Sequence, residues 1–280
     1  SPIAALQAAK LNPAHIAGDS KWMIHLDIDA VLASEIGQDA KSKLQEPAAK
    51  EKLQAIKEAF GIDLEKGLHG VTAYGNGERD NGVLIAHADA DKQKLLNFAK
   101  LNEGYEKSSY NGHKIHSIDD KRKQTHVCFH SPGTIVVAQT QDLVQKGVDL
   151  LDGKNAAIKV SEGMRSISEE LDNPMMIAYG DFSGIKEITD NPRAAMLKMA
   201  SSTGIAVGES LGIVKAAMFL EAVDADSCQQ IESIVRGIMA LGSLQRDKQP
   251  DLAKLSNAFN VERKENLLKV VFRMDTQDLI

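Results

Sequence analysis

Two aspartates placed two residues apart are the sharpest chemical feature of the sequence. Asp27 and Asp29 stand in the stretch IHLDIDAVL (24–32), where a short apolar run predicts a strand that ends at the first carboxylate. At a strand end, Asp27 could attack a phosphoryl group while Asp29 acts as general acid and base and Mg²⁺ neutralises the phosphate. A Mg²⁺-dependent phosphohydrolase is therefore one hypothesis for this protein.

This stretch resembles the opening motif of the haloacid-dehalogenase-like phosphatases, in which hydrophobic residues precede Asp-x-Asp-x-Val. The related stretch GDFSGI (180–185) carries Ser183 in place of the second aspartate, and no convincing acidic metal motif follows downstream. Helix capping explains both stretches, with Asp29 and Ser183 as capping residues that accept hydrogen bonds from the first helical N–H groups. The sequence therefore favours a structural role, and we expect no catalytic residue.

A second candidate site lies in the stretch 114–130, which reads as a β-hairpin. If Ile115 lies opposite Phe129 and both face the core, alternation places four possible ligands on the other face. Three imidazoles and a thiolate could bind Zn²⁺ or Cu²⁺. The alternative is that these are incidental histidines on a half-exposed strand. The four residues are His116, His126, Cys128 and His130.

The sequence holds two cysteines, Cys128 and Cys228, which are too few for a disulfide framework. A disulfide between them is left open by the sequence. Cys228 falls in the first turn of a predicted helix, where the helix dipole favours the thiolate but two nearby acids oppose it. We expect a structural thiol.

The elements that carry these residues recur along the chain. TQDL occurs at 140–143 and again at 276–279, and related acidic motifs, ADADK and VDADS, stand 51 and 52 residues before them when measured from Asp89 and Asp224. The stretch 22–34 also resembles 176–188. The spacing predicts a tandem duplication with an N-terminal segment (1–21), a first repeat (22–154) and a second repeat (155–280).

Strand-like runs around turn-rich segments predict hairpins in each repeat, at 70–87 and 113–130 in the first. Apolar residues at helical spacing predict a helix after each acidic motif, with one face on the sheet. The predicted class is α+β, with a mostly antiparallel sheet and helices packed on one face of it. The helical apolar residues are Leu95, Leu96, Phe98, Ala99 and Leu101, and Ile231, Ile234, Val235, Ile238 and Leu241.

Composition excludes several classes of partner. The 280 residues carry a net charge of −6, which argues against binding to nucleic acid or to an anionic membrane. No apolar run approaches the roughly 20 residues of a membrane-spanning helix. Aromatic residues make up 4% of the chain, so aliphatic side chains and methionines must fill its core.

The arrangement of motifs resembles a family of exported bacterial proteins of unknown function, the DUF3352 type. The similar stretches include FGIDLEKGLHGVTAYG (60–75), GYEKSSYNGHKIHSI (104–118) and FNVERKENLLKVVFRM (259–274). The resemblance implies periplasmic or secreted localisation and a duplicated α+β fold, and it transfers no active site. The leading hypothesis is a non-catalytic binding or structural role in the cell envelope. We expect no cofactor, and the expected partner is an envelope protein or a small ligand.

Overall fold

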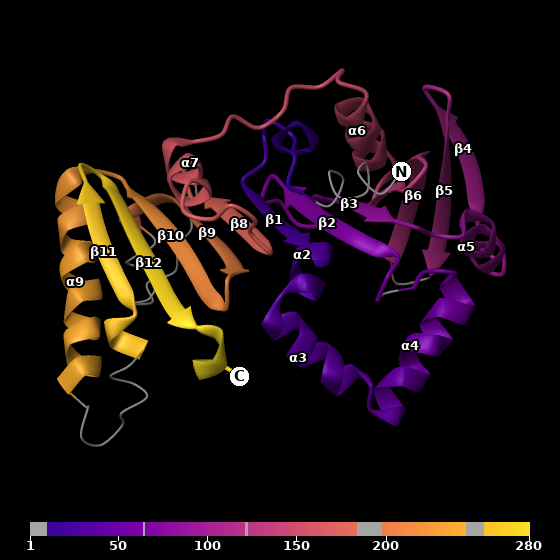
Figure 1. Ribbon diagram of the computed structural model, residues 1–280. Coiled ribbons are helices and arrows are strands. Elements are labelled where there is room, and N and C mark those ends of the chain that lie inside the picture. The colour runs from indigo at the N-terminus through magenta and orange to yellow at the C-terminus, as the bar shows by residue number, and fades with distance from the viewer. Residues whose placement is uncertain (1–9, 64, 121–122, 184–197, 245–254) are drawn as a thin grey trace. The chain divides into compact units, whose positions relative to one another are not determined.

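The computed structural model describes residues 10–63, 65–120, 123–183, 198–244 and 255–280. The chain divides into two compact units, residues 1–159 and 160–280 (Figure 1). The predicted boundary between residues 154 and 155 lies five residues before this division. Within each unit, every strand pairing described below is antiparallel and helices pack on the sheet, so the α+β class is confirmed.

Unit 1 holds a seven-stranded sheet among its described residues. The predicted hairpins are confirmed, because the second strand pairs with the third and the fifth with the sixth. A tight turn at Asn111 and Gly112, both with positive φ, joins the fourth strand to the fifth. In spatial order the strands are β1 (Trp22–Asp27), β2 (Leu68–Gly75), β3 (Gly82–Ala88), β7 (Thr134–Ala138), β6 (Lys123–Ser131), β5 (His113–Asp120) and β4 (Glu106–Tyr110).

One helix of unit 1, α6 (Gln141–Leu151), covers the strands that carry most of the histidines. Thr140 of the first TQDL accepts a hydrogen bond from the N–H of Leu143 and so caps the helix. Its buried face packs on β3, β5, β6 and β7. In the part of the chain that the structure describes, unit 1 also contains the helices η1 (Pro13–His15), α2 (Ile28–Ala33), α3 (Glu35–Leu44), α4 (Pro47–Phe60) and α5 (Lys92–Ala99).

The stripe expected on α5 is only partly buried. Ala99 is buried and Leu95 and Leu96 are half-buried, but Phe98 and Leu101 are exposed. The helix ends at Ala99, so Leu101 falls outside its regular spacing, and α5 packs against α4. The prediction that this whole stripe packs on the sheet is wrong.

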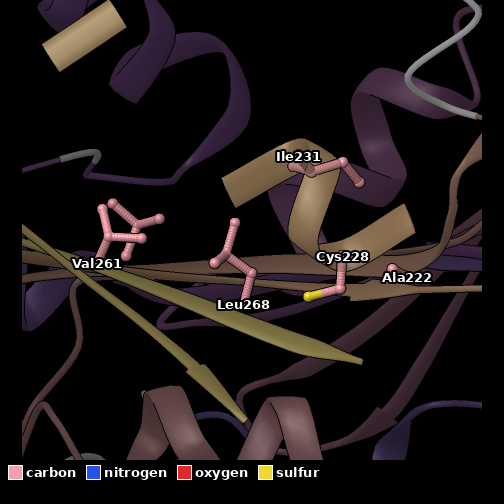
Figure 2. Packing of buried hydrophobic residues seen from close by; sticks show 6 residues of the cluster. Ala222, Cys228, Ile231, Val261 and Leu268 are labelled. Atoms are coloured by element: carbon pink, nitrogen blue, oxygen red, sulfur yellow. The ribbon is translucent and has the colours of Figure 1, made fainter. Parts of the chain in front are cut away.

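Unit 2 holds a five-stranded sheet among its described residues, with α7 (Glu162–Ser168), α9 (Ala225–Leu244) and η2 (Thr276–Asp278). Apolar side chains of α9 and of three strands form a buried cluster, part of which is drawn in Figure 2. Cys228 and Ile231 enter it from the helix, and Leu268 enters it from the sheet. In spatial order the strands are β8 (Met176–Asp181), β9 (Ala200–Ser210), β10 (Ile213–Ala222), β12 (Leu267–Asp275) and β11 (Phe259–Lys264).

Helices α7 and α9 cover opposite faces of the sheet of unit 2. Leu268 packs toward α9, whereas the neighbouring Lys269 on the same strand reaches Glu170, just beyond α7. Successive side chains of a strand point to opposite faces, so α7 and α9 lie on different sides. The expectation that helices pack on one face is wrong for this unit, because its strands bury apolar residues on both faces.

The contact between α7 and the sheet depends on a glycine, which has no side chain to separate the helix from the strand. Phe219 of β10 is fully buried, and a Cβ atom at Gly163 of α7 would lie 2.3 Å from its ring. The helix therefore approaches the strand as closely as it does only because residue 163 is glycine.

We predict that Gly163→Ala destabilises the protein by about 1 to 3 kcal/mol, because the added methyl group overpacks the site of Phe219. A matched control is Gly237→Ala in α9, where a Cβ would meet no atom within 4 Å among the described residues. That substitution should stabilise the protein by about 0.5 to 1 kcal/mol through helix propensity alone. Urea unfolding measures both; equal stability of the two variants contradicts the packing argument.

Glu170 holds the chain after α7 onto two strands. Its carboxylate accepts hydrogen bonds from Lys215 at 2.7 Å, Lys269 at 2.9 Å and Arg273 at 3.3 Å. Lys215 and Lys269 lower the pKa of Glu170 to about 2, against the opposing effect of burial. A carboxylate paired with three cations stays ionised across the neutral and mildly acidic range.

We predict that Glu170→Gln lowers the free energy of unfolding at neutral pH by about 1 to 2 kcal/mol. Because the folded pKa is depressed, this contribution is fully present above the unfolded pKa of about 4.3 and is lost as the pH falls toward about 2. Urea unfolding at several pH values measures it. Glu169→Gln, at an exposed neighbour, is the control; an equal loss there would contradict the assignment.

Candidate functional site

Asp27 and Asp29 lie at the junction of β1 and α2. Asp27 is the helix N-cap, since its Oδ1 accepts a hydrogen bond from the N–H of Ala30 at 2.8 Å. Burial raises the pKa of Asp27, and the charge of Asp29 adds to this, while the bond from Ala30 opposes it. The cap is thus Asp27 rather than Asp29, two residues earlier than expected, because the strand passes directly into the helix at Ile28.

Asp29 belongs to a chain of polar side chains that sequence reasoning missed. Its two carboxylate oxygens lie 3.0 and 3.1 Å from Nδ1 of His69, whose Nε2 lies 3.3 Å from Asp89. Burial lowers the pKa of His69, but the hydrogen bonds to the two aspartates outweigh it and raise the pKa. The antiparallel pairing of Asp27 with Gly70 brings the neighbouring His69 to this end of β1.

Both aspartates form hydrogen bonds that have a structural role. Asp27 accepts a helical N–H, and Asp29 faces an imidazole that its charge helps to protonate. The strands around them are antiparallel, whereas haloacid-dehalogenase-like chemistry normally occupies a parallel sheet. The phosphohydrolase remains an untested hypothesis, to be tested by phosphoester turnover with Mg²⁺ in wild type and Asp27→Asn.

We predict that Asp29→Asn lowers the pKa of His69, measured by NMR titration of its ring. The raised folded pKa means that the interaction stabilises the fold fully below the unfolded pKa of about 6.5 and ceases to do so as the pH rises through the folded value. The substitution should therefore cost about 0.5 kcal/mol near pH 6 and less near pH 9. Asp142→Asn, whose carboxylate pairs with Lys146, should leave His69 unchanged; an identical titration curve in Asp29→Asn would refute the coupling.

The register of the 113–131 hairpin differs from the expected one by one residue. Ile115 pairs with Cys128, not with Phe129, and His116 pairs with Val127. Cys128 and Ile115 are both fully buried, so the thiol fills the core position that the sequence suggested for Phe129. His126 and Cys128 therefore share a face with Ile115, and His116 points the other way. The four expected metal ligands do not come together.

His116 and His126 each have a local hydrogen-bond partner. Nδ1 of His116 lies 2.7 Å from the hydroxyl of Tyr105, and its ring meets the ring of Phe129 edge-on at 6.0 Å. Nδ1 of His126 lies 2.7 Å from the hydroxyl of Ser117. Burial lowers the pKa of both histidines, which favours neutral imidazoles at physiological pH.

The fourth expected ligand, His130, belongs to a different group. Its ring stacks on that of His113 with centroids 4.7 Å apart, and its Nε2 lies 2.9 Å from Oδ1 of Asp152 at the end of α6. Lys154 and His130 lower the pKa of Asp152 to about 2. The correct strand register was the missing signal, because continuing the Ile115–Cys128 pairing by two residues sets His113 across from His130.

Both cysteines are free and buried, so the disulfide left open by the sequence is not present in this structure. Burial raises the pKa of Cys128 to about 11 and also raises that of Cys228. Neither thiol is activated, which agrees with a structural role for Cys228.

The helix α9 carries a second apolar face that the sequence did not separate from the first. Ile231 is buried and Val235 and Met239 pack on the same cluster. Ile234 is 43% exposed, and Ile238 and Leu241 are each 64% exposed. The expectation that these residues all face the sheet is wrong, because one sheet covers only part of the helix circumference. We call Ile234, Ile238, Leu241 and the exposed Leu244 the α9 stripe.

Comparison with known proteins shows the fold and no activity. No family model and no curated protein matches the chain. Crystal form III of TP0453 aligns with a TM-score of 0.56 at 8% identity, covering 97% of each chain. Form IV gives a TM-score of 0.53 and form I gives 0.52, each at 8% identity and covering 97% of this chain and 96% of that chain. Identity this low shows a similar fold alone.

No helix in the described part of the chain is long and apolar enough to cross a membrane.

Proposed function

We propose that this chain is an exported, non-catalytic binding protein of the bacterial cell envelope, and that the α9 stripe is its binding surface. The observation that carries this is the exposure of three large aliphatic side chains at positions 234, 238 and 241, one and two turns apart on one helix. Contiguous exposed apolar surface commonly marks an interaction site. Export is supported by the resemblance of stretches such as 60–75 and 259–274 to an exported family.

The partner we propose is the apolar face of another envelope protein. A helix that lies on an anionic membrane carries an excess of Lys and Arg on its polar side, whereas α9 carries Asp226, Glu232 and Arg236. Gly237 lies along the α9 stripe, in open space among the described residues. Glycine in a helix interior lowers the stability of the helix. It also allows the backbone of a partner to approach the helix closely, which is consistent with a binding surface at this position.

We further propose that the two units arose by duplication. In spatial order, β1, β2, β3, β7 and β6 of unit 1 match β8, β9, β10, β12 and β11 of unit 2. In both series the strand that comes last in the chain, β7 or β12, lies fourth, between the third strand and the strand that precedes it in the chain. A helix follows the third strand in each, and each TQDL follows the last strand. The hairpin strands β4 and β5 are then an addition to unit 1.

We predict that a photo-crosslinking amino acid at Ile238, introduced in the native bacterium, captures one envelope protein. The same group at Gln229, an exposed residue on the polar side of α9, should capture none, because apolar contact needs the stripe. The captured protein is then purified, and its affinity for the full chain is measured. Leu241→Glu should weaken binding at least about tenfold, since it places a charge in the apolar contact.

Three outcomes would overturn the proposed surface. They are equal capture at Ile238 and Gln229, capture of lipid or of a second copy of this chain alone, and unchanged affinity of Leu241→Glu. Fractionation of the bacterium tests export separately, and recovery of the chain in the cytoplasm would contradict it.

A further inference from the structure

We infer that unit 1 contains a binding site for a divalent transition metal such as Zn²⁺, formed by His113, His130 and Asp152. The site is distinct from the α9 stripe and from the four residues expected on the hairpin, of which it retains only His130. Its ligand atoms are the two imidazole nitrogens and one carboxylate oxygen, and they lie within 4.8 Å of one another.

The distances approach those of a metal centre. Oδ1 of Asp152 lies 2.9 Å from Nε2 of His130 and 3.8 Å from Nε2 of His113. Donors bound to Zn²⁺ at about 2.0 Å in a tetrahedron are about 3.3 Å apart. The two distances to Asp152 each differ from this value by about 0.5 Å or less, and the two stacked rings would tilt toward each other to place all three donors around one ion.

Backbone structure holds each ligand in place. The β6–β7 register shifts between Phe129 and Ser131, so His130 occupies an irregular position next to a paired strand. The His130 ring still lies against that of His113, where the Ile115–Cys128 register places it. His113 begins β5 directly after the tight turn at Asn111 and Gly112, which limits its movement.

A second aspartate on α6 fastens that turn to the helix. Asp149, three residues before Asp152, accepts hydrogen bonds from Tyr110 at 2.6 Å and from Asn111 at 2.9 Å. Lys154 lies 2.8 Å from Oδ2 of Asp152, which leaves Oδ1 to face the imidazoles. Interactions of this kind orient metal ligands and are part of a working site.

The donor set selects the class of metal. Two imidazoles and one carboxylate suit Zn²⁺, Ni²⁺ or Cu²⁺, whereas Mg²⁺ and Ca²⁺ prefer oxygen donors alone. Side-chain exposures of 16 to 22% leave the ligands accessible, so water can complete the coordination. A simple ion pair is the competing explanation, but it needs only one histidine, whereas two imidazole nitrogens face the same carboxylate oxygen here.

Calorimetric titration of the full chain, freed of metal with a chelator, tests the inference with ZnSO₄ as the probe. We expect one Zn²⁺ per chain and no binding of Mg²⁺. His113→Ala and Asp152→Asn should each weaken Zn²⁺ binding at least about tenfold. His126→Ala is the matched control, because this histidine lies on the same hairpin with Ser117 as its partner, and its affinity should equal that of wild type.

NMR spectroscopy of the wild-type protein tests the site without any substitution. Addition of Zn²⁺ should shift the ring NMR signals of His113 and His130 and leave those of His116 and His126 in place. The inference is overturned if saturating Zn²⁺ shifts neither ring, or if His113→Ala and Asp152→Asn bind Zn²⁺ as tightly as wild type. Circular dichroism and thermal melting without metal verify that each variant is folded.

Discussion

The alternation of side chains along antiparallel strands decides where the functional groups of this protein lie. A shift of one residue in pairing exchanges the two faces of a strand, so the identity of the residue that fills the core fixes every neighbour. In the hairpin of β5 and β6 that residue is Cys128, paired with Ile115. His130 consequently meets His113 and Asp152, and His116 is directed to the other side with Tyr105.

The same alternation shapes unit 2 differently, because its strands are apolar on both faces. Phe219 and Leu268 are both fully buried although they face opposite helices. Each helix that packs on a face of this sheet buries only one of its own sides against it. The long helix α9 has more apolar surface than the sheet can cover, and its remaining residues form the stripe that we propose as a binding surface.

Electrostatic interactions divide the chain in another way. All eight histidines lie in unit 1, where Asp29 and Asp89 flank His69, and Asp152 faces His113 and His130. Unit 2 instead pairs Glu170 with lysines and an arginine, whose charge does not change near neutral pH. The histidine whose pKa is raised by its aspartates, His69, and the metal site that we infer at His113, His130 and Asp152 therefore both belong to unit 1.

The sequence by itself determined the α+β class, both hairpins of the first half, and the helix that follows each acidic motif. These features depend on local periodicity and turn residues, which act over a few positions. Tertiary structure decided which hairpin residue faces the core, which helix covers which face, and how much of α9 stays exposed. It also joined His113 to Asp152 across 39 residues of sequence. Such contacts depend on the packing of whole elements against one another, and a difference of one residue in register or one face of a helix is invisible to local pattern.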